Sequence, residues 1–269
     1  GRRLRRGDLR SRRRGAVAPH RRLHGMHDLS LAIPQDALAL GAASLGMVLF
    51  VESVKALAAN GIFSSASSRK VMHVGAGPLF LLFWPLFTKD GSLVASLVPL
   101  AMTLKFAATG LGLVRNDAEV RSMSRTGDRR ELLRGPLLYG FAFVALTKLC
   151  WRSAHGVAAM MALCFGDGMA EVVGRRFCPP GSSGRLPWSP RKSWVGSAAF
   201  LASAVVSSSI YFELFRMWGW IGPERLALLA QLTVACAAGA AVESLPWVEI
   251  DNVLVPLVVA GVLARLRAN

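Results

Sequence analysis

The sequence is poor in charge for its length, and it is especially poor in acidic residues. Only 18% of its 269 residues are charged, whereas 53% are hydrophobic, and the mean hydropathy is +0.41. These proportions exclude an ordinary soluble globular domain of this size. They predict an all-α fold, a polytopic bundle of transmembrane helices, because helices satisfy their own backbone hydrogen bonds in lipid.

Cysteine is also scarce, with four residues in the whole chain. No two of them form a CxxC pair and their spacing is irregular, so the sequence carries neither a disulfide framework nor a zinc-binding pattern. The four cysteines are Cys150, Cys164, Cys178 and Cys236.

Asp and Glu number 16 against 32 Lys and Arg, which gives a formal net charge of +16. Such an excess is typical of nucleic-acid-binding proteins, but much of it is confined to the first 22 residues, where Asp8 stands among ten arginines. The remaining excess lies in loops between apolar runs, where membrane proteins retain positive charge. We therefore expect membrane lipid, and no nucleic acid, as a partner.

Residues 1–30 form a basic leader, and residues 31–269 form the predicted membrane domain. An Arg-rich, acid-poor leader predicts a transit peptide for an organelle, a chloroplast or a mitochondrion. The alternative is a basic tail that touches anionic lipid.

Apolar runs in the membrane domain predict about seven or eight spans, each long enough or nearly long enough to cross a bilayer. The fourth and eighth are short, so one of them could be re-entrant or interfacial. With eight crossings, the loops after the first, third, fifth and seventh spans share one membrane face, and these loops hold most of the motif-like residues. The candidate spans are residues 34–58, 71–88, 92–114, 136–151, 154–174, 194–212, 226–245 and 252–266.

The segment FGDGMAEVVGRRF, residues 165–177, places Asp167 and Glu171 in an apolar surrounding. Their i, i+4 spacing puts both carboxylates on one face of a helix, and Arg175 continues that face. Carboxylates hold a hard divalent cation, and Arg and Lys neutralise phosphate oxygens, so the pattern indicates a metal–polyphosphate site. The alternative is a pore-lining helix followed by ordinary loop charges.

A second cationic group, Arg191-Lys192-Ser193, follows a loop rich in Gly, Pro and Ser. Earlier in the chain, His73 follows Lys70 by about one helical turn. Taken alone, His73 is more typical of a histidine at a helix end than of a catalytic one. Gly75 and Gly77 would permit close backbone approach there.

Five ordered segments together resemble the phytol kinase and farnesol kinase family, within the polyprenol kinase group. The resemblance runs from about residue 52 to about residue 257 and covers nearly the whole membrane domain. It implies a polytopic membrane enzyme that phosphorylates an isoprenoid alcohol such as phytol, geranylgeraniol or farnesol. The implied donor is CTP in preference to ATP, with a divalent metal such as Mg²⁺, at plastid membranes where phytol is recycled towards tocopherol. The segments are SRKVMHVGAGPLF, SRTGDRRELLRGPLLYG, FGDGMAEVVGRRF, PRKSWVGS and VESLPWVEIDNVLVPL.

The resemblance also implies roles for single residues. Asp167 becomes the leading catalytic carboxylate, and Lys192 and His73 become further catalytic candidates. The phosphate- and nucleotide-binding candidates that match family motifs are Arg69, Lys70, Lys192 and Ser193, and the charge pattern adds Arg175, Arg176 and Arg191. The resemblance implies Asp167, Glu243 and Asp251 as metal ligands, and the charge pattern adds Glu171.

The sequence departs from the family pattern at two positions. Glu171 stands where the family usually has Asp, which keeps the charge and lengthens the side chain. Val195 stands where many relatives have a small or acidic residue. An apolar Val195 suits a wall against a prenyl chain or a helix-packing contact.

Two other functions remain open at this point. The segment around Lys192 also resembles CDP-diglyceride synthase, which implies a CTP-dependent phosphatidate cytidylyltransferase. That family has Glu at the position of Val195, so one of its carboxylates is missing here. The third interpretation is a small transporter in which Asp167 and Glu171 line an ion path.

Overall fold

A computed structural model describes residues 24–179, 181–247 and 249–268. Residues 1–23 of the predicted leader therefore lie outside the described part of the chain. Within that part, the structure is helical apart from one short hairpin, which confirms the predicted all-α class. The α-helices are α1 (His24–Ala59), α2 (Ser65–Phe83), α3 (Ser92–Leu111), α4 (Asp117–Met123), α5 (Gly135–Leu149), α6 (Ala154–Met161), α7 (Asp167–Phe177), α8 (Trp194–Met217), α9 (Arg225–Glu243) and α10 (Asp251–Ala268).

Shorter elements join these helices. One 3₁₀ turn follows α2 and another precedes α5. A π-helical turn links α6 to α7 without a break. The hairpin precedes α8, and its two strands pair antiparallel with a register shift between the two residues of the first strand. The 3₁₀ turns are Trp84–Leu86 and Arg129–Leu133, the π turn is Ala162–Gly166, and the strands are β1 (Arg185–Leu186) and β2 (Ser189–Ser193).

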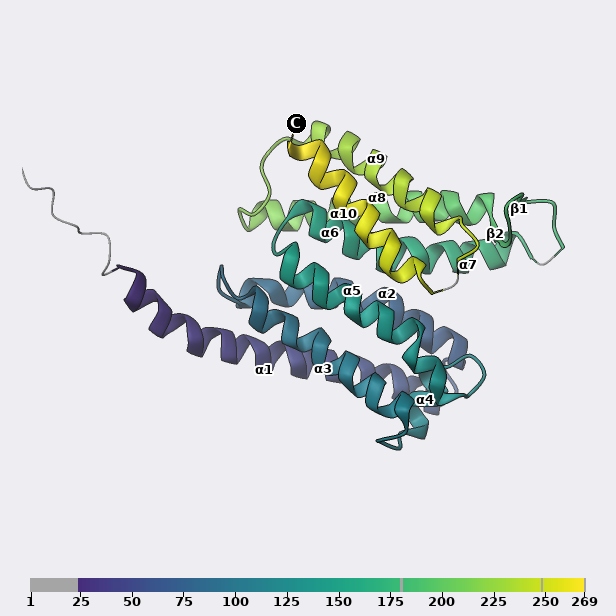
Figure 1. Ribbon diagram of the computed structural model, residues 1–269, viewed down its shortest axis with the longest axis horizontal. Helices are drawn as coiled ribbons and strands as arrows, with labels where there is room; N and C mark the ends of the chain where they lie inside the picture. The colour runs from purple at the N-terminus through teal and green to yellow at the C-terminus, as the bar shows by residue number, and fades with distance from the viewer. Residues whose placement is uncertain (1–23, 180, 248, 269) are drawn as a thin grey trace, which may run out of the picture.

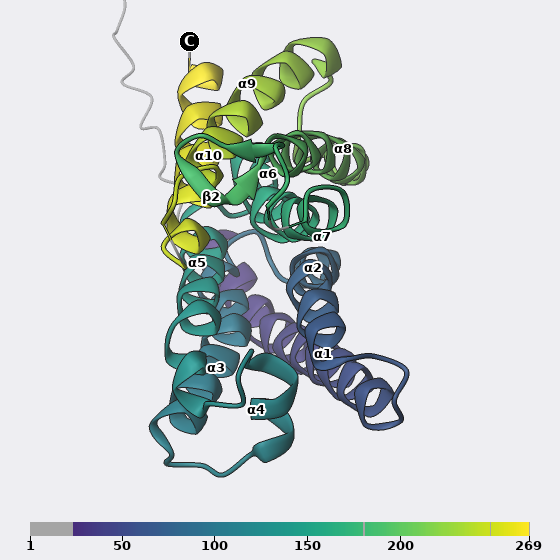
Figure 2. The same ribbon diagram turned by 90° about the vertical axis from the view of Figure 1, so that its right-hand side faces the viewer.

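The helices form two groups stacked on each other (Figure 1). One group contains α1 to α5 and the other contains α6 to α10, and the view turned by 90° shows the same division (Figure 2). The helix α6 lies in the interior, and every residue from Val157 to Cys164 is fully buried. This segment, VAAMMALC, is apolar on all sides, which suits a helix surrounded by others.

Six helical segments are long and apolar enough to cross a membrane: Pro34–Ala59, Ser92–Leu111, Arg129–Leu149, Ala154–Phe177, Trp194–Met217 and Arg225–Glu243. The count of seven or eight spans is therefore not confirmed. The segments predicted at residues 71–88 and 252–266 do form helices, α2 and α10, but neither belongs to this set. The first turns of α2 are rich in Ser and contain Arg69 and Lys70, and α10 has three charged residues in its 18.

The loops predicted to share one membrane face meet at one end of the bundle, where residues from all four line a common cavity. We expect cysteines introduced at Ala66, Arg130, Ser183 and Ile250 of a cysteine-free variant to react with an impermeant maleimide from the same side of sealed vesicles. A cysteine at Asp90, in the turn before α3, should react from the opposite side. A mixed pattern among the first four would show that a crossing has been miscounted.

Candidate functional site

A cavity of about 350 Å³ lies between the two groups of helices. Its size falls at the lower end of the range for small-molecule sites. Residues of α1, α2, α3, α5, α7, β2, α8 and the α9–α10 connection contribute to its lining. One part of the lining is apolar and the other carries most of the charged residues predicted from the sequence.

The helix α2 follows the change from polar to apolar along the cavity. Arg69, His73, Ala76 and Phe80 all line it, and their spacing of three to four residues puts them on one helix face. From Arg69 to Phe80 this face extends about 16 Å. The lining passes from a guanidinium to a fully buried phenyl ring. The cavity therefore suits a ligand with a charged end and a long apolar end.

The apolar part is built largely from flexible and aromatic side chains. They come from α1, α2, α3 and α5, that is, from the first group of helices. Methionine adapts to irregular ligand shapes because its side chain is unbranched and polarisable. The main contributors are Met47, Phe50, Met72, Phe80, Met102, Phe106 and Phe143.

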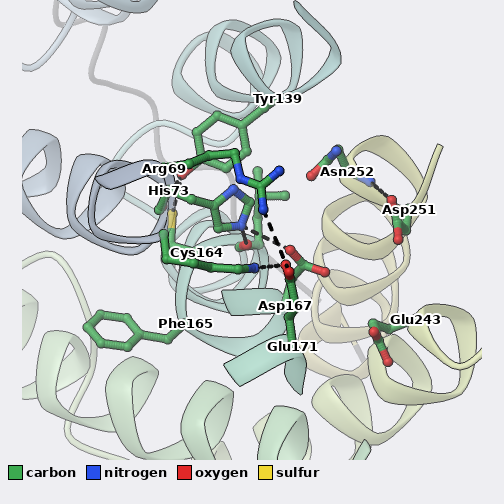
Figure 3. A network of polar contacts seen from close by, with 12 residues as sticks. Arg69, His73, Tyr139, Cys164, Phe165, Asp167, Glu171, Glu243, Asp251 and Asn252 are labelled. Atoms are coloured by element: carbon green, nitrogen blue, oxygen red, sulfur yellow. Dashed lines mark hydrogen bonds and ion pairs between the residues drawn. The ribbon is translucent and has the colours of Figure 1, made fainter. Parts of the chain in front are cut away.

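Asp167 lies where the polar part begins. The Nε2 atom of His73 is 3.0 Å from the Oδ2 atom of Asp167 and 3.0 Å from the carbonyl oxygen of Leu163. The hydroxyl of Tyr139 donates to the carbonyl oxygen of His73 over 2.5 Å, and the two rings are 4.5 Å apart. Figure 3 shows Tyr139, His73 and Asp167 converging in this way. His73 is thus held from two sides and in turn orients the carboxylate.

The π turn before Asp167 explains why these groups can meet. In this turn the N–H of Asp167 donates to Ala162 and Cys164, which leaves the carbonyl of Leu163 available to His73. Such turns often occur at functional sites. Gly77 of α2 packs against Cys164, and a side chain at Gly77 would overlap the sulfur atom. The predicted close approach at this glycine is therefore confirmed.

Glu171 lies one turn beyond Asp167 and is surrounded by cations. Its carboxylate is 2.7 Å from the guanidinium of Arg175 and 3.7 Å from that of Arg69, and it also contacts Lys70. Figure 3 shows Arg69 and Glu171 beside Asp167. The three cations outnumber the single carboxylate, so this part of the site is suited to an anionic ligand.

Lys192 lies between two carboxylates that come from distant parts of the sequence. Its Nζ atom is 2.5 Å from Glu243 and 3.4 Å from Asp251. Burial alone would lower the pKa of Lys192, but the surrounding carboxylates outweigh burial and raise this pKa above its ordinary value. Burial and the charge of Asp167 raise the pKa of Asp251. Lys192 therefore stays charged at neutral pH.

Ser193 has a structural role beside its position on the cavity. Its hydroxyl accepts a hydrogen bond of 3.1 Å from the N–H of Gly196 and so caps the first turn of α8. Serine is a favoured residue at such a position. The cap ends β2 and starts α8, which places Lys192 directly next to the helix.

The structure brings most of the predicted site residues together. Asp167, Glu171, Glu243, Asp251, His73, Arg69, Lys70, Arg175, Arg191, Lys192 and Ser193 all line the main cavity. Arg176 does not line it and is exposed, because it lies about 100° around the helix from Arg175. Val195 does not line it either, so the predicted wall against a prenyl chain is not seen at this position.

The lining residues that had no role in the sequence-based prediction include three with polar groups: Tyr139, Arg185 and Trp247. Tyr139 is the penultimate residue of the segment SRTGDRRELLRGPLLYG and is one of two tyrosines in the chain. Its position within one of the five family-like segments was the sequence signal that could have identified it as a site residue. Arg185 donates to the backbone carbonyls of Arg191 and Cys178, both over 2.7 Å, and so supports the hairpin.

The fold and the site together define a class: helical proteins with segments of membrane-spanning length and a cavity whose lining is rich in cations at one end and apolar at the other. Comparison with known proteins narrows this class. The chain belongs to the phytol kinase and farnesol kinase family. No protein-family model matches it, and no solved structure shows significant similarity.

Three relatives illustrate this membership. The protein named probable phytol kinase 2, chloroplastic, from Oryza sativa subsp. japonica is 37% identical over 255 residues, which are 92% of this chain and 80% of the relative. Phytol kinase 1, chloroplastic, from Arabidopsis thaliana is 31% identical over 79% of this chain and 70% of its own length. Farnesol kinase, chloroplastic, from the same plant is 39% identical over 69% of this chain and 60% of its own length.

Proposed function

We propose that this protein is a membrane kinase that transfers the γ-phosphate of CTP to an isoprenoid alcohol, phytol first and geranylgeraniol or farnesol next. The observation that carries the proposal is a cavity in which a cation-rich part adjoins an apolar part, with Asp167 and His73 at the boundary. The names of the relatives support an isoprenoid alcohol as the acceptor. The phosphorylated alcohol would feed isoprenoid salvage, including the route to tocopherol.

The apolar part of the cavity would hold the prenyl chain. Its hydroxyl end would then reach the boundary between Phe80 and Asp167, because α2 leads from one to the other along a single face. The methionines of the lining would adapt to chains of different shape. A substrate that partitions into lipid suits helices of membrane-spanning length.

The cation-rich part would hold the triphosphate. Arg69, Lys70 and Arg175 surround one carboxylate, and Lys192, on strand β2, lines the same cavity. Phosphoryl transfer depends mainly on positioning and on neutralising the charge of the transferred group. These four residues supply both without covalent chemistry.

The carboxylates present fit a nucleotide-bound Mg²⁺ with few protein ligands. Within residues 24–179, 181–247 and 249–268 no cluster of three or more His, Cys, Asp or Glu forms a metal site. Mg²⁺ in nucleotide sites commonly takes one or two carboxylates and completes its shell with phosphates and water. Asp167 suits this role best, because Glu171, Glu243 and Asp251 are already engaged by cations. Bound there, the metal would neutralise charge on the phosphates.

In the proposed reaction the alcohol oxygen attacks the γ-phosphorus, the bond from this phosphorus to the β–γ bridging oxygen breaks, and CDP leaves. The alcohol gives up its proton as the new bond forms, and the side chains in the cavity that could accept it are Asp167, His73 and Asp251. His73 would hold Asp167 in place through Nε2. Lys192 would neutralise charge that develops on the leaving diphosphate.

CTP as the donor and a plastid membrane as the location are parts of the same proposal. The relatives named above are called chloroplastic, and six helical segments have the length and apolarity for a bilayer. These observations support an integral protein of a chloroplast membrane.

The test is an assay of the purified protein in detergent with phytol and CTP labelled at either the α- or the γ-phosphorus. We expect γ-label in a lipid monophosphate, CDP as the other product, and no product when divalent cations are chelated. Transfer of α-label with release of pyrophosphate would instead show a cytidylyltransferase. A transporter would form no phosphorylated product at all.

A further inference from the structure

A second and smaller cavity, of about 100 Å³, lies between the hairpin strand β2 and the connection from α9 to α10. It shares Arg191, Lys192 and Trp247 with the main cavity, so it adjoins the cation-rich part. Its remaining lining comes from Ser189, Pro190 and Pro246. A ligand whose phosphates contact Lys192 could therefore extend into this second space.

Ser189 offers the small cavity a hydroxyl group that could form a hydrogen bond to a polar ligand. Its side chain is fully buried, and among the described residues its hydroxyl has no hydrogen-bond partner. Buried hydroxyls in folded proteins are normally paired. A ligand in the cavity that Ser189 lines would supply the missing partner.

The other walls offer planar surfaces. Trp247 is 49% exposed and lines both cavities. Arg191 is exposed and lines both as well, and a guanidinium can stack on a planar ring. Aromatic rings of this kind bind nucleobases by stacking.

The walls are also held together without a ligand. The indole N–H of Trp188 donates to the carbonyl oxygen and to the hydroxyl of Ser244, both at 3.2 Å. This contact ties the hairpin to the connection after α9. The small cavity is thus preorganised, which reduces the entropic cost of binding.

We propose that the small cavity is the subsite for the nucleoside end of the phosphate donor. The base would stack on Trp247, the hydroxyl of Ser189 would hydrogen-bond to the base or the ribose, and the triphosphate would run past Lys192 towards Asp167. This inference rests on the proposed function, namely that the main cavity binds a nucleoside triphosphate. The prenyl chain belongs elsewhere, because the apolar part of the main cavity is built from the first group of helices.

The test compares Trp247→Ala and Trp247→Phe with the wild type. Trp247→Ala should raise the KM for CTP about 10-fold through the loss of stacking, with the KM for phytol unchanged and kcat within a few-fold. Trp247→Phe should recover most of the affinity, because a phenyl ring still stacks. Inorganic tripolyphosphate, which lacks a nucleoside, should inhibit all three proteins equally. Ser189→Ala should raise the KM for CTP by a few-fold.

Leu226→Ala is the control, because Leu226 is a large apolar side chain that is 82% exposed, lines neither cavity and lies at the start of α9. It should leave the KM for CTP unchanged. An unchanged KM in Trp247→Ala would overturn the subsite, and so would an equal loss of affinity for CTP and tripolyphosphate.

Failure of the proposed function would look different. A wild-type protein that phosphorylates no alcohol from any nucleotide would contradict the kinase, and the subsite would then be tested by binding alone. CTP should raise the melting temperature of the wild type, and Trp247→Ala should lose this rise while keeping the one caused by tripolyphosphate. Equal responses of both proteins to CTP would refute the subsite.

Discussion

Asp167→Asn is expected to lower kcat by roughly 10³-fold or more, which corresponds to about 4 kcal/mol of transition-state stabilisation. Asp167 lies at the boundary between the two parts of the cavity, and His73 already fixes its carboxylate. Asn can still accept the hydrogen bond from His73, but it lacks the charge that a metal–phosphate complex needs. The measurement is the initial rate of phytyl monophosphate formation at saturating CTP and phytol.

Folding of this variant should be preserved, because removing a charge from a helix in a membrane does not oppose insertion. The control is Asp90→Asn, an exposed aspartate that does not line the cavity. It should keep the wild-type rate, and both variants should keep the wild-type melting temperature within a few degrees. If Asp167→Asn turned over at a near-wild-type rate, the role of this carboxylate would be refuted. A loss of folded protein instead of a loss of rate would make it structural.

Much of the helical architecture could be predicted from local pattern. The apolar runs located each long helix to within about six residues, except at the start of α1, which begins ten residues before the predicted residue 34. The i, i+4 spacing of Asp167 and Glu171 correctly put both on one side of the cavity. Such predictions succeed because helix periodicity depends only on neighbours in sequence. The same periodicity explains why the prediction failed for Arg176. Arg176 directly follows Arg175 in the sequence, so its side chain points to a different side of the helix and does not line the cavity.

The parts that were not predicted depend on contacts between distant segments. The hairpin before α8 consists of two short strands in a stretch rich in Gly, Pro and Ser. This stretch has no alternating hydrophobicity, so its sequence predicts a loop. The π turn before Asp167 has no distinct sequence pattern. Nothing near Tyr139 indicates that its hydroxyl reaches the backbone of His73, 66 residues earlier.

The partners of Lys192 illustrate the same limit. The basic side chain of Lys192 predicted a phosphate-binding role, and the acidic segment at residues 243–252 predicted a metal-binding role. The structure places these groups against each other, with Lys192 between Glu243 and Asp251, 51 and 59 residues away. Composition alone could not distinguish a carboxylate that holds a metal from one that holds a lysine, because both roles need the same charge.

Lys192→Met is therefore expected to have two effects, one on stability and one on rate. It leaves the carboxylates of Glu243, whose side chain is 4% exposed, and Asp251 without their cation. Breaking a buried pair in this way costs about 3 kcal/mol or more of unfolding free energy. Loss of the positive charge beside the leaving diphosphate should also lower kcat by about 10²-fold or more. The measurements are thermal unfolding in detergent and the γ-phosphate transfer assay.

The double variant Lys192→Met/Glu243→Gln separates these two effects. It removes both charges of the closest pair, so most of the lost stability should return, since an uncompensated buried charge is what makes the single change costly. The rate should stay low, because the missing ammonium is not restored. Lys89→Met, an exposed lysine that lines neither cavity, should change neither quantity. Recovery of both stability and turnover in the double variant would show that Lys192 only neutralises Glu243 and takes no part in phosphoryl transfer.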